Sequence, residues 1–90
     1  MAKTEDILKE RGQTYGNYSR QAAITRNLND VLEEGMGKHK DLEHDQLDAL
    51  YMVCVKLARI VNGNPNHIDN WRDIAGYATL VADRLEKENE

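Results

Sequence analysis

The chain has 90 residues, of which 40 % are hydrophobic and 31 % are charged, and its formal net charge at pH 7 is −4. This acidic balance excludes the basic face of a duplex nucleic-acid binder, although a nucleotide pocket needs only one or two cations. We expect a single domain over residues 1–90. A chain of this length buries only about 60–65 % of its unfolded surface, which favours a homodimer or a higher homo-oligomer.

The number of cysteines and the composition of the first ten residues predict the cellular compartment. Cys54 is the single cysteine, so it has no partner for a disulfide or a thiolate zinc site, and we expect a reduced, buried thiol. The first ten residues, MAKTEDILKE, are charged and lack the apolar segment of a signal peptide. No apolar run reaches the about 18 residues of a membrane span. We therefore expect a cytoplasmic protein that does not bind membranes.

The first two helices are predicted from caps and apolar spacing. The segment TEDILKERG, residues 4–12, has Thr4 as a suitable N-cap, and Gly12 is expected to end the helix. The loop GQTYGNY follows. A second helix is predicted from Ser19, another N-cap residue, to about residue 34. Its apolar stripe consists of Ile24, Leu28, Val31 and Leu32.

The third and fourth helices are longer. Apolar residues recur every three or four positions from about residue 43 to residue 62, and residues 49–55 are apolar nearly all round. This pattern indicates a central helix that is covered on more than one side. The turn NGNPN ends it, and HIDNWRDIAGYATLVAD begins a fourth helix that runs to about residue 87. The expected fold is all-α, a small antiparallel bundle of one short N-terminal helix and three longer helices.

Polar residues on the third and fourth helices are spaced to lie on facing sides. Lys56 and Arg59 are three residues apart, and Asp69, Asp73 and Tyr77 follow one another by four. Because a short loop joins these helices, they should pack antiparallel. We expect an ion pair between Arg59 and Asp73, with Lys56 reaching Asp73 or Tyr77.

Gly76 lies in the middle of the fourth helix, where glycine costs roughly 1 kcal/mol relative to alanine. It predicts a close approach of another backbone or of a ligand beside Asp73 and Tyr77. Two interpretations stay open. The cluster is a salt bridge that locks two tightly packed helices, or it also lines a functional pocket.

The loop RGQTYGNYSR places Arg11, Tyr15, Gly16 and Tyr18 beside the start of the second helix. Helix N-termini favour anions, and tyrosine either stacks on a base or caps a core. A helix cap with buried tyrosines and a nucleotide-binding loop therefore both stay open.

Carboxylates that suit Mg²⁺ occur in two pairs, Asp30 with Glu33 and Asp45 with Asp48, each on one helix face. We prefer to interpret these acids as solvated helix faces. The three histidines are scattered, so a zinc site is not expected; they are His39, His44 and His67.

Three segments, RGQTYGNYS, LYMVCVKLARIVNG and DNWRDIAGYATLVAD, resemble a family of small phage and prophage proteins of unknown function. The shared pattern is an early arginine with a Tyr-Gly pair, a Lys-x-x-Arg on the central helix, and Asp-x-x-x-Asp-Ile-Ala-Gly-Tyr-Ala on the last. The resemblance covers roughly residues 8–83. It carries over to Arg11, Tyr15, Gly16, Lys56, Arg59, Asp73, Gly76 and Tyr77.

More remotely, this family is similar to the all-α nucleotide pyrophosphatases of the MazG type, which are oligomeric and hold magnesium by Glu-x-x-Glu and Glu-x-x-Asp motifs. The acid pairs of this chain depart from both motifs, so the similarity supports a nucleotide pocket and weakens the case for catalysis. The implied nucleotide-binding residues are Arg11, Tyr15, Gly16, Lys56, Arg59, Asp73 and Tyr77.

The sequence therefore predicts a phage-derived, MazG-like nucleotide-binding protein of the host cytoplasm. No catalytic residue and no definite cofactor are indicated. An enzyme of this kind would use Mg²⁺, with Asp69 and Asp73 as candidate ligands, to hydrolyse a nucleoside triphosphate at the α–β bond. We expect binding without turnover. The alternative is a non-catalytic interaction protein that binds a host or phage protein as an inhibitor, an adaptor or an anti-defence factor.

Overall fold

The computed structural model describes residues 4–37 and 41–89. Within these residues the chain forms four helices and no strands, which confirms the all-α bundle. The helices are α1 (Thr4–Tyr15), α2 (Tyr18–Met36), α3 (His44–Asn62) and α4 (Ile68–Glu88). His39 lies outside the described residues.

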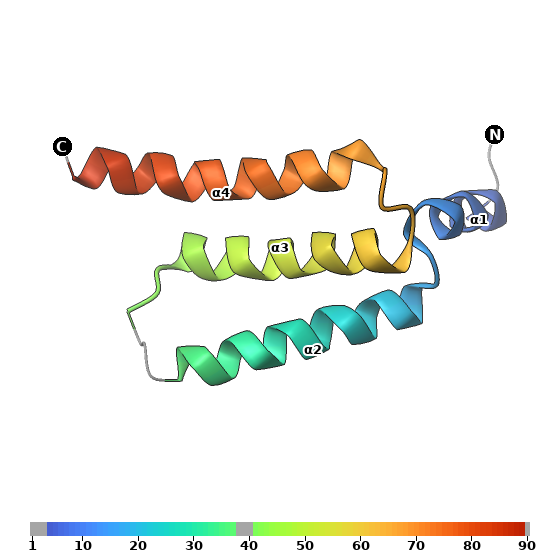
Figure 1. Ribbon diagram of the computed structural model, residues 1–90, viewed down its shortest axis with the longest axis horizontal. Helices are drawn as coiled ribbons and strands as arrows, with labels where there is room; N and C mark the ends of the chain where they lie inside the picture. The colour runs from blue at the N-terminus through green and yellow to red at the C-terminus, as the bar shows by residue number, and fades with distance from the viewer. Residues whose placement is uncertain (1–3, 38–40, 90) are drawn as a thin grey trace.

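The three long helices form one layer. α2, α3 and α4 lie side by side and antiparallel with α3 in the middle, and the shorter α1 lies at one end (Figure 1). α3 contacts both α2 and α4, whereas α2 and α4 make no contact with each other in the described part of the chain. The position of α3 confirms the prediction of a central helix.

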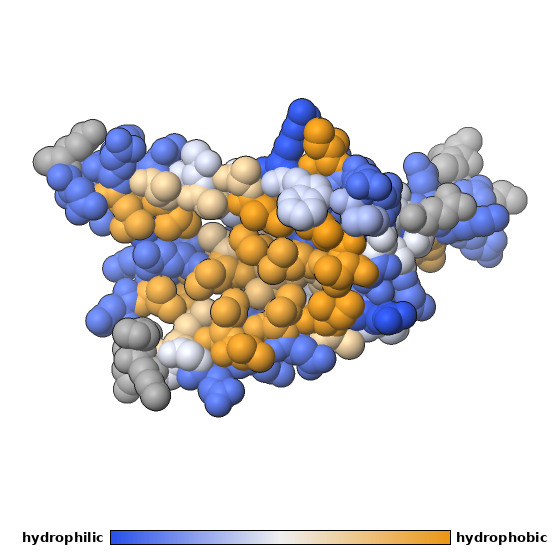
Figure 2. Space-filling view, viewed as in Figure 1, coloured by the Kyte–Doolittle hydropathy of each residue, from blue (hydrophilic) through white to orange (hydrophobic). Residues whose placement is uncertain are grey.

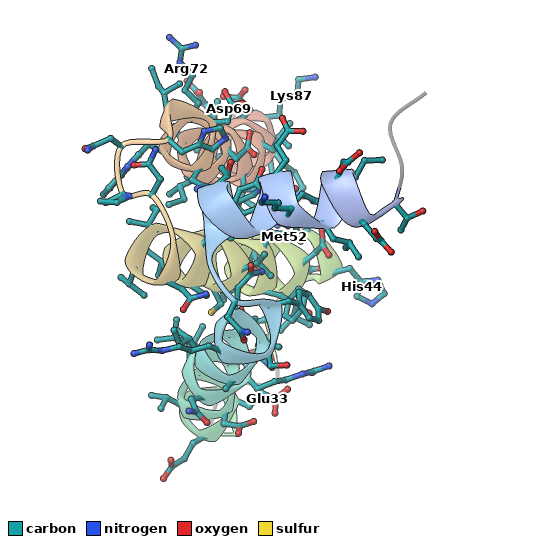
Figure 3. The ribbon with its side chains drawn as sticks, turned by 90° about the vertical axis from the view of Figure 1, so that its right-hand side faces the viewer. Glu33, His44, Met52, Asp69, Arg72 and Lys87 are labelled. Atoms are coloured by element: carbon teal, nitrogen blue, oxygen red, sulfur yellow. The ribbon has the colours of Figure 1, made fainter. Side chains whose placement is uncertain are left out.

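The layer has two broad faces. The face seen in Figure 2 is apolar across a wide area. α1 contacts α2 and α3, and the view from the end of the layer shows it extending on the other side (Figure 3). We call these the apolar face and the α1 face.

The first two helices begin and end differently from the sequence prediction. α1 continues through Gly12 to Tyr15, because a glycine ends a helix only where its backbone dihedral angles leave the helical region. It ends before Gly16, whose φ is 82°. The N-cap of α2 is Asn17 rather than Ser19, and its side-chain oxygen accepts a hydrogen bond from the Arg20 backbone N–H at 3.0 Å.

The ends of α3 agree with the prediction. Glu43 and Gln46 form a capping box in which the Gln46 side chain accepts from the Glu43 backbone N–H at 2.8 Å. Gly63 is the C-cap, and its N–H donates to the Arg59 carbonyl at 3.0 Å. α4 begins after His67 and runs one residue beyond the expected end.

The turn between α1 and α2 is fastened to the end of α3. The Asn62 side-chain amide donates to the Tyr15 carbonyl at 3.1 Å and to the Asn17 carbonyl at 2.9 Å. The Asn64 N–H donates to the Thr14 carbonyl at 2.8 Å. A Cβ atom at Gly16 would overlap the backbone oxygen of Asn62, so only glycine allows this approach.

The buried interior is small. Among the described residues its hydrophobic members are Cys54, Ala58 and Ile60, all on α3. The predicted buried thiol is confirmed, and burial raises the pKa of Cys54. Polar residues make up the remainder, namely Gln21, Thr25, Lys56 and Asn70. No described helix combines the length and apolarity needed to cross a membrane.

An ion pair joins the start of α3 to the end of α4. The Arg84 guanidinium donates two hydrogen bonds to the Asp45 carboxylate, one of them at 2.8 Å, and also contacts Glu88 at 3.1 Å. These hydrogen bonds hold the pKa of Asp45 below its ordinary value of 3.8. Asp45 is thus engaged by an arginine on the neighbouring helix.

Replacing Gly16 with alanine tests the fastened turn. The left-handed backbone costs a non-glycine residue roughly 1–2 kcal/mol, and the added methyl group also displaces Asn62. We expect Gly16→Ala to lower the free energy of unfolding by more than about 1 kcal/mol in urea titration. Unchanged stability would show that the turn shifts freely.

Gly76→Ala is the matched control. A Cβ atom there meets nothing within 4 Å, so the close approach predicted from the sequence is not made within the described chain. We therefore expect a gain of roughly 0.4–1 kcal/mol from the reduced entropy of the unfolded chain. A loss of stability would instead indicate a close contact with another molecule.

The Asp45–Arg84 pair predicts a dependence of stability on pH. Because the folded pKa of Asp45 is lowered, its contribution is fully present above the ordinary pKa of 3.8 and is lost as pH falls through the folded pKa. The stability difference between the native chain and Asp45→Asn should be constant above that value and shrink below it. Asp48→Asn is the control, and an equal pH dependence for both variants would contradict the assignment.

Candidate functional site

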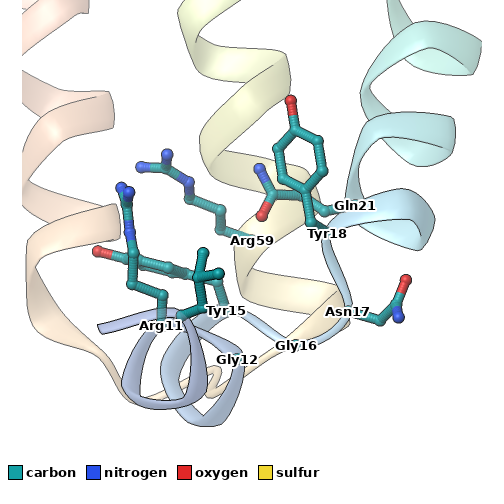
Figure 4. Close-up of a pocket in the computed structure, with 9 residues that line it drawn as sticks. Arg11, Gly12, Tyr15, Gly16, Asn17, Tyr18, Gln21 and Arg59 are labelled. Carbon is teal, nitrogen blue, oxygen red and sulfur yellow. The ribbon is translucent and has the colours of Figure 1, made fainter. Parts of the chain in front are cut away.

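A cavity of about 380 Å³ opens on the α1 face, where the turn between α1 and α2 meets the end of α3 (Figure 4). Its lining combines two arginines, two tyrosines and the backbone of two glycines. The lining residues are Leu8, Arg11, Gly12, Tyr15, Gly16, Asn17, Tyr18, Gln21 and Arg59.

Tyr15 is the centre of this cavity. The Arg59 guanidinium carbon lies 4.6 Å from the centroid of the Tyr15 ring, and the Arg11 guanidinium carbon lies 6.0 Å from it. Both arginine side chains extend beside the ring in Figure 4. The His67 imidazole packs against Tyr15 edge to face, with 5.7 Å between centroids. The ring thus holds two cations at one place through cation–π contacts.

Arg59 is incompletely satisfied. Its Nε atom is buried and has no hydrogen-bond partner. Within residues 4–37 and 41–89, neither Arg59 nor Arg11 forms an ion pair. A buried donor without an acceptor costs about 1–3 kcal/mol. The cavity therefore presents two guanidinium groups that an anion would satisfy.

Asp73 pairs with Lys56 and not with Arg59, so the predicted Arg59–Asp73 pair is wrong. The Lys56 ammonium lies 2.9 Å from the Asp73 carboxylate, and the two side chains are 10 % and 47 % exposed. Arg59 is turned onto Tyr15, a residue that the sequence placed only in a loop. The expectation that Lys56 reaches Asp73 is confirmed.

The residues predicted to bind a nucleotide fall into two groups. Arg11, Tyr15, Gly16 and Arg59 meet in the cavity. Asp73, Gly76 and Tyr77 instead line a separate open depression on α4, together with Arg72, Ala75, Thr79 and Leu80. Lys56 joins this second group through its ion pair with Asp73.

Some residues that build the cavity were not singled out from the sequence. Gln21 lines it and is buried, and the Asn62 side chain donates hydrogen bonds to the carbonyl groups of two lining residues, Tyr15 and Asn17. Gln21 and Thr25 continue the apolar stripe of α2 in register with Leu28 and Leu32, and this register is a signal that polar residues face the interior there. Asn62 forms hydrogen bonds with residues that lie 47 and 45 positions earlier in the chain. The local sequence around Asn62 therefore gives no indication of this role.

The candidate metal ligands do not assemble. Across the part of the chain that the structure describes, no group of three or more His, Cys, Asp or Glu residues is placed to hold a metal ion. Asp69 lies 3.7 Å from His67 and Asp73 pairs with Lys56. Glu33 accepts a hydrogen bond from Asn29 at 3.1 Å. These carboxylates thus lie at different places in the fold.

The chain belongs to a family that is defined by a domain of unknown function, DUF6378, whose model matches residues 1–85. Comparisons with curated proteins and with solved structures gave no match. The match confirms the expectation of a family of unknown function that spans almost the whole chain.

The Lys56–Asp73 pair predicts a modest effect on stability. Because the Asp73 carboxylate is about half exposed, solvent screens the pair, and Asp73→Asn should cost about 1 kcal/mol in urea unfolding. A fully buried pair would cost roughly 3–5 kcal/mol. In a chain that already carries Lys56→Met, Asp73→Asn should cost nothing, because no buried ammonium remains to be stranded. An equal cost in both backgrounds would contradict the pairing.

Proposed function

We propose that this protein binds a nucleotide in the cavity around Tyr15. The observation that carries the proposal is the pair of guanidinium groups, Arg11 and Arg59, gathered at one ring with a buried Arg59 Nε that lacks an acceptor. In a chain with a net charge of −4, such a local concentration of positive charge needs an anionic partner.

The phosphate groups are the natural partners of the two arginines. A guanidinium presents several donors in a planar fork that matches the oxygens of a phosphate. The first turn of α2 also borders the cavity through Asn17, Tyr18 and Gln21. Since a helix N-terminus carries partial positive charge, it adds to the attraction for an anion.

The base has an aromatic and polar surround. Tyr18 is exposed and lines the cavity, so its ring offers a face on which a base can stack. The Gln21 amide supplies a donor and an acceptor for a base edge. The volume of about 380 Å³ falls at the lower end of the range for small-molecule pockets and suits a mononucleotide.

The resemblance to MazG-type pyrophosphatases supports the same ligand class, and the resemblance to small phage and prophage proteins supports a phage origin. Among the described residues, however, no carboxylate lines the cavity. The acid pairs of α2 and α3 stand outside it, and Asp45 is engaged by Arg84. The protein therefore binds the nucleotide without hydrolysing it in this proposal. A purely protein-binding role is the alternative, and it requires no nucleotide affinity.

Isothermal titration calorimetry with nucleoside mono- and triphosphates, with and without Mg²⁺, tests the proposal. Arg59→Gln should weaken binding at least tenfold, because a charge-assisted hydrogen bond contributes about 1.5–3 kcal/mol and each 1.4 kcal/mol is roughly tenfold in affinity. Arg72→Gln, which changes an exposed arginine of α4, is the matched control and should bind normally.

The opposite results are equally clear. If no nucleotide binds the native chain, or if Arg59→Gln and Arg72→Gln weaken binding equally, the cavity is not the site. Pyrophosphate release from a triphosphate that persists in Arg72→Gln and disappears in Arg59→Gln would show turnover and overturn the non-catalytic form.

A further inference from the structure

The face of the layer opposite α1 carries apolar side chains from all three long helices (Figure 2). Its centre is identified by a shallow groove of about 320 Å³ between α3 and α4, lined by Leu42, Gln46, Ala49, Leu50, Val53, Ala78 and Val81. Helical spacing extends this side of α3 to Leu57 and this side of α4 to Trp71, Ala82 and Leu85.

The contribution of α2 follows from the same reasoning. One side of α2 faces the α1 face of the layer, where Ala22, Thr25 and Arg26 line a pocket together with Arg59. Helical spacing therefore places Ile24 and Val31 on the apolar face. Val31 and Leu57 are large apolar residues that are 67 % and 39 % exposed.

The chain exposes too much surface for a protein of its mass. Its accessible surface is 7067 Å², whereas a compact monomer of 10.3 kDa exposes about 5,400 Å². Its radius of gyration is 15.6 Å, against about 12 Å for a compact chain of this length. A layer of three helices accounts for differences of this sign, because it leaves one side of each helix uncovered.

We propose that a second copy of this chain covers the apolar face and forms a two-fold symmetric dimer with two layers of helices. The excess is roughly 1,700 Å² per chain, so an interface that removed this excess from both chains would bury about 3,400 Å² in total, which lies in the range of obligate homodimers. In a two-fold interface the same patch meets itself, so the patch must avoid opposed like charges.

The distribution of charge meets this requirement. The named members of the face on α2, α3 and α4 are uncharged. The charged residues of α4 occupy other positions: Asp73 pairs with Lys56, Arg84 pairs with Asp45, and Arg72 lines the depression around Gly76. On α2, Arg20 lies one turn before Ile24, at the end of this surface. The remaining surface, made of uncharged residues of three helices, fits a second copy of itself.

This inference is independent of the nucleotide site. The cavity around Tyr15 opens on the α1 face, so both cavities of the dimer would face outward and keep their access to ligand. Loss of nucleotide binding in Arg59→Gln leaves the dimer in place, and loss of the dimer leaves the cavity lining unchanged.

Light scattering coupled to size exclusion at micromolar concentration tests the dimer. The native chain should have twice the monomer mass, and Leu57→Glu should place a charge in the interface and raise the dimer dissociation constant at least tenfold. Leu80→Glu is the matched control. It makes the same change at a side chain that is 68 % exposed and lines the depression on the other side of α4, so it should remain a dimer.

Two further measurements guard against a variant that fails to fold. Val31→Glu changes a highly exposed residue of α2 and should dissociate the dimer while circular dichroism shows retained helix. The melting temperature of the native chain should also rise with protein concentration, because dimerisation stabilises the folded state.

Several results would overturn the inference. They are a monomer mass with a concentration-independent melting temperature, an oligomer that both Leu57→Glu and Val31→Glu leave intact, and equal dissociation by Leu80→Glu.

Emission from Trp71, which is half exposed in the single chain, should shift to longer wavelength in Leu57→Glu when the interface opens.

Discussion

The packing of α3 between α2 and α4 is the constraint from which the other features follow. The two outer helices do not contact each other in the described chain, so the layer is one helix thick and its interior is limited to the sides of α3. The buried hydrophobic residues, Cys54, Ala58 and Ile60, therefore belong to α3. The layer leaves two broad faces, and α1 contacts the layer on one of them.

The α1 face acquires its chemistry from a polar fastening. Asn62 binds the carbonyl groups on both sides of Gly16, and this contact brings Tyr15 to the end of α3. Arg59, one turn earlier on α3, is then within reach of the Tyr15 ring. The two guanidinium groups of the cavity thus come from arginines that are 48 positions apart in the sequence. Both proposals rest on this division, with ligand binding on one face and self-association on the other.

Two acidic residues stabilise the contact between α3 and α4. Asp45 with Arg84 and Asp73 with Lys56 join α3 to α4, the first pair at the start of α3 and the second nearer its end. Both carboxylates are partly exposed, so each pair contributes modestly and mainly fixes how the two helices align. Both pairs lie outside the cavity, and within the described residues neither Arg11 nor Arg59 has an acidic partner.

Local sequence predicted the four helices, the all-α class and the bounds of α3, because apolar spacing and helix caps act within a few residues. It also identified Arg11, Tyr15, Gly16 and Arg59, which meet in one cavity. It did not give the end of α1, since a glycine ends a helix only where its backbone turns, and that turn at Gly16 is fixed by contact with Asn62. The partner of Asp73 could be identified only from the packed helices. Lys56 and Arg59 lie one turn apart on α3, so spacing alone does not distinguish them, and in the structure Arg59 packs on the Tyr15 ring while Lys56 pairs with Asp73.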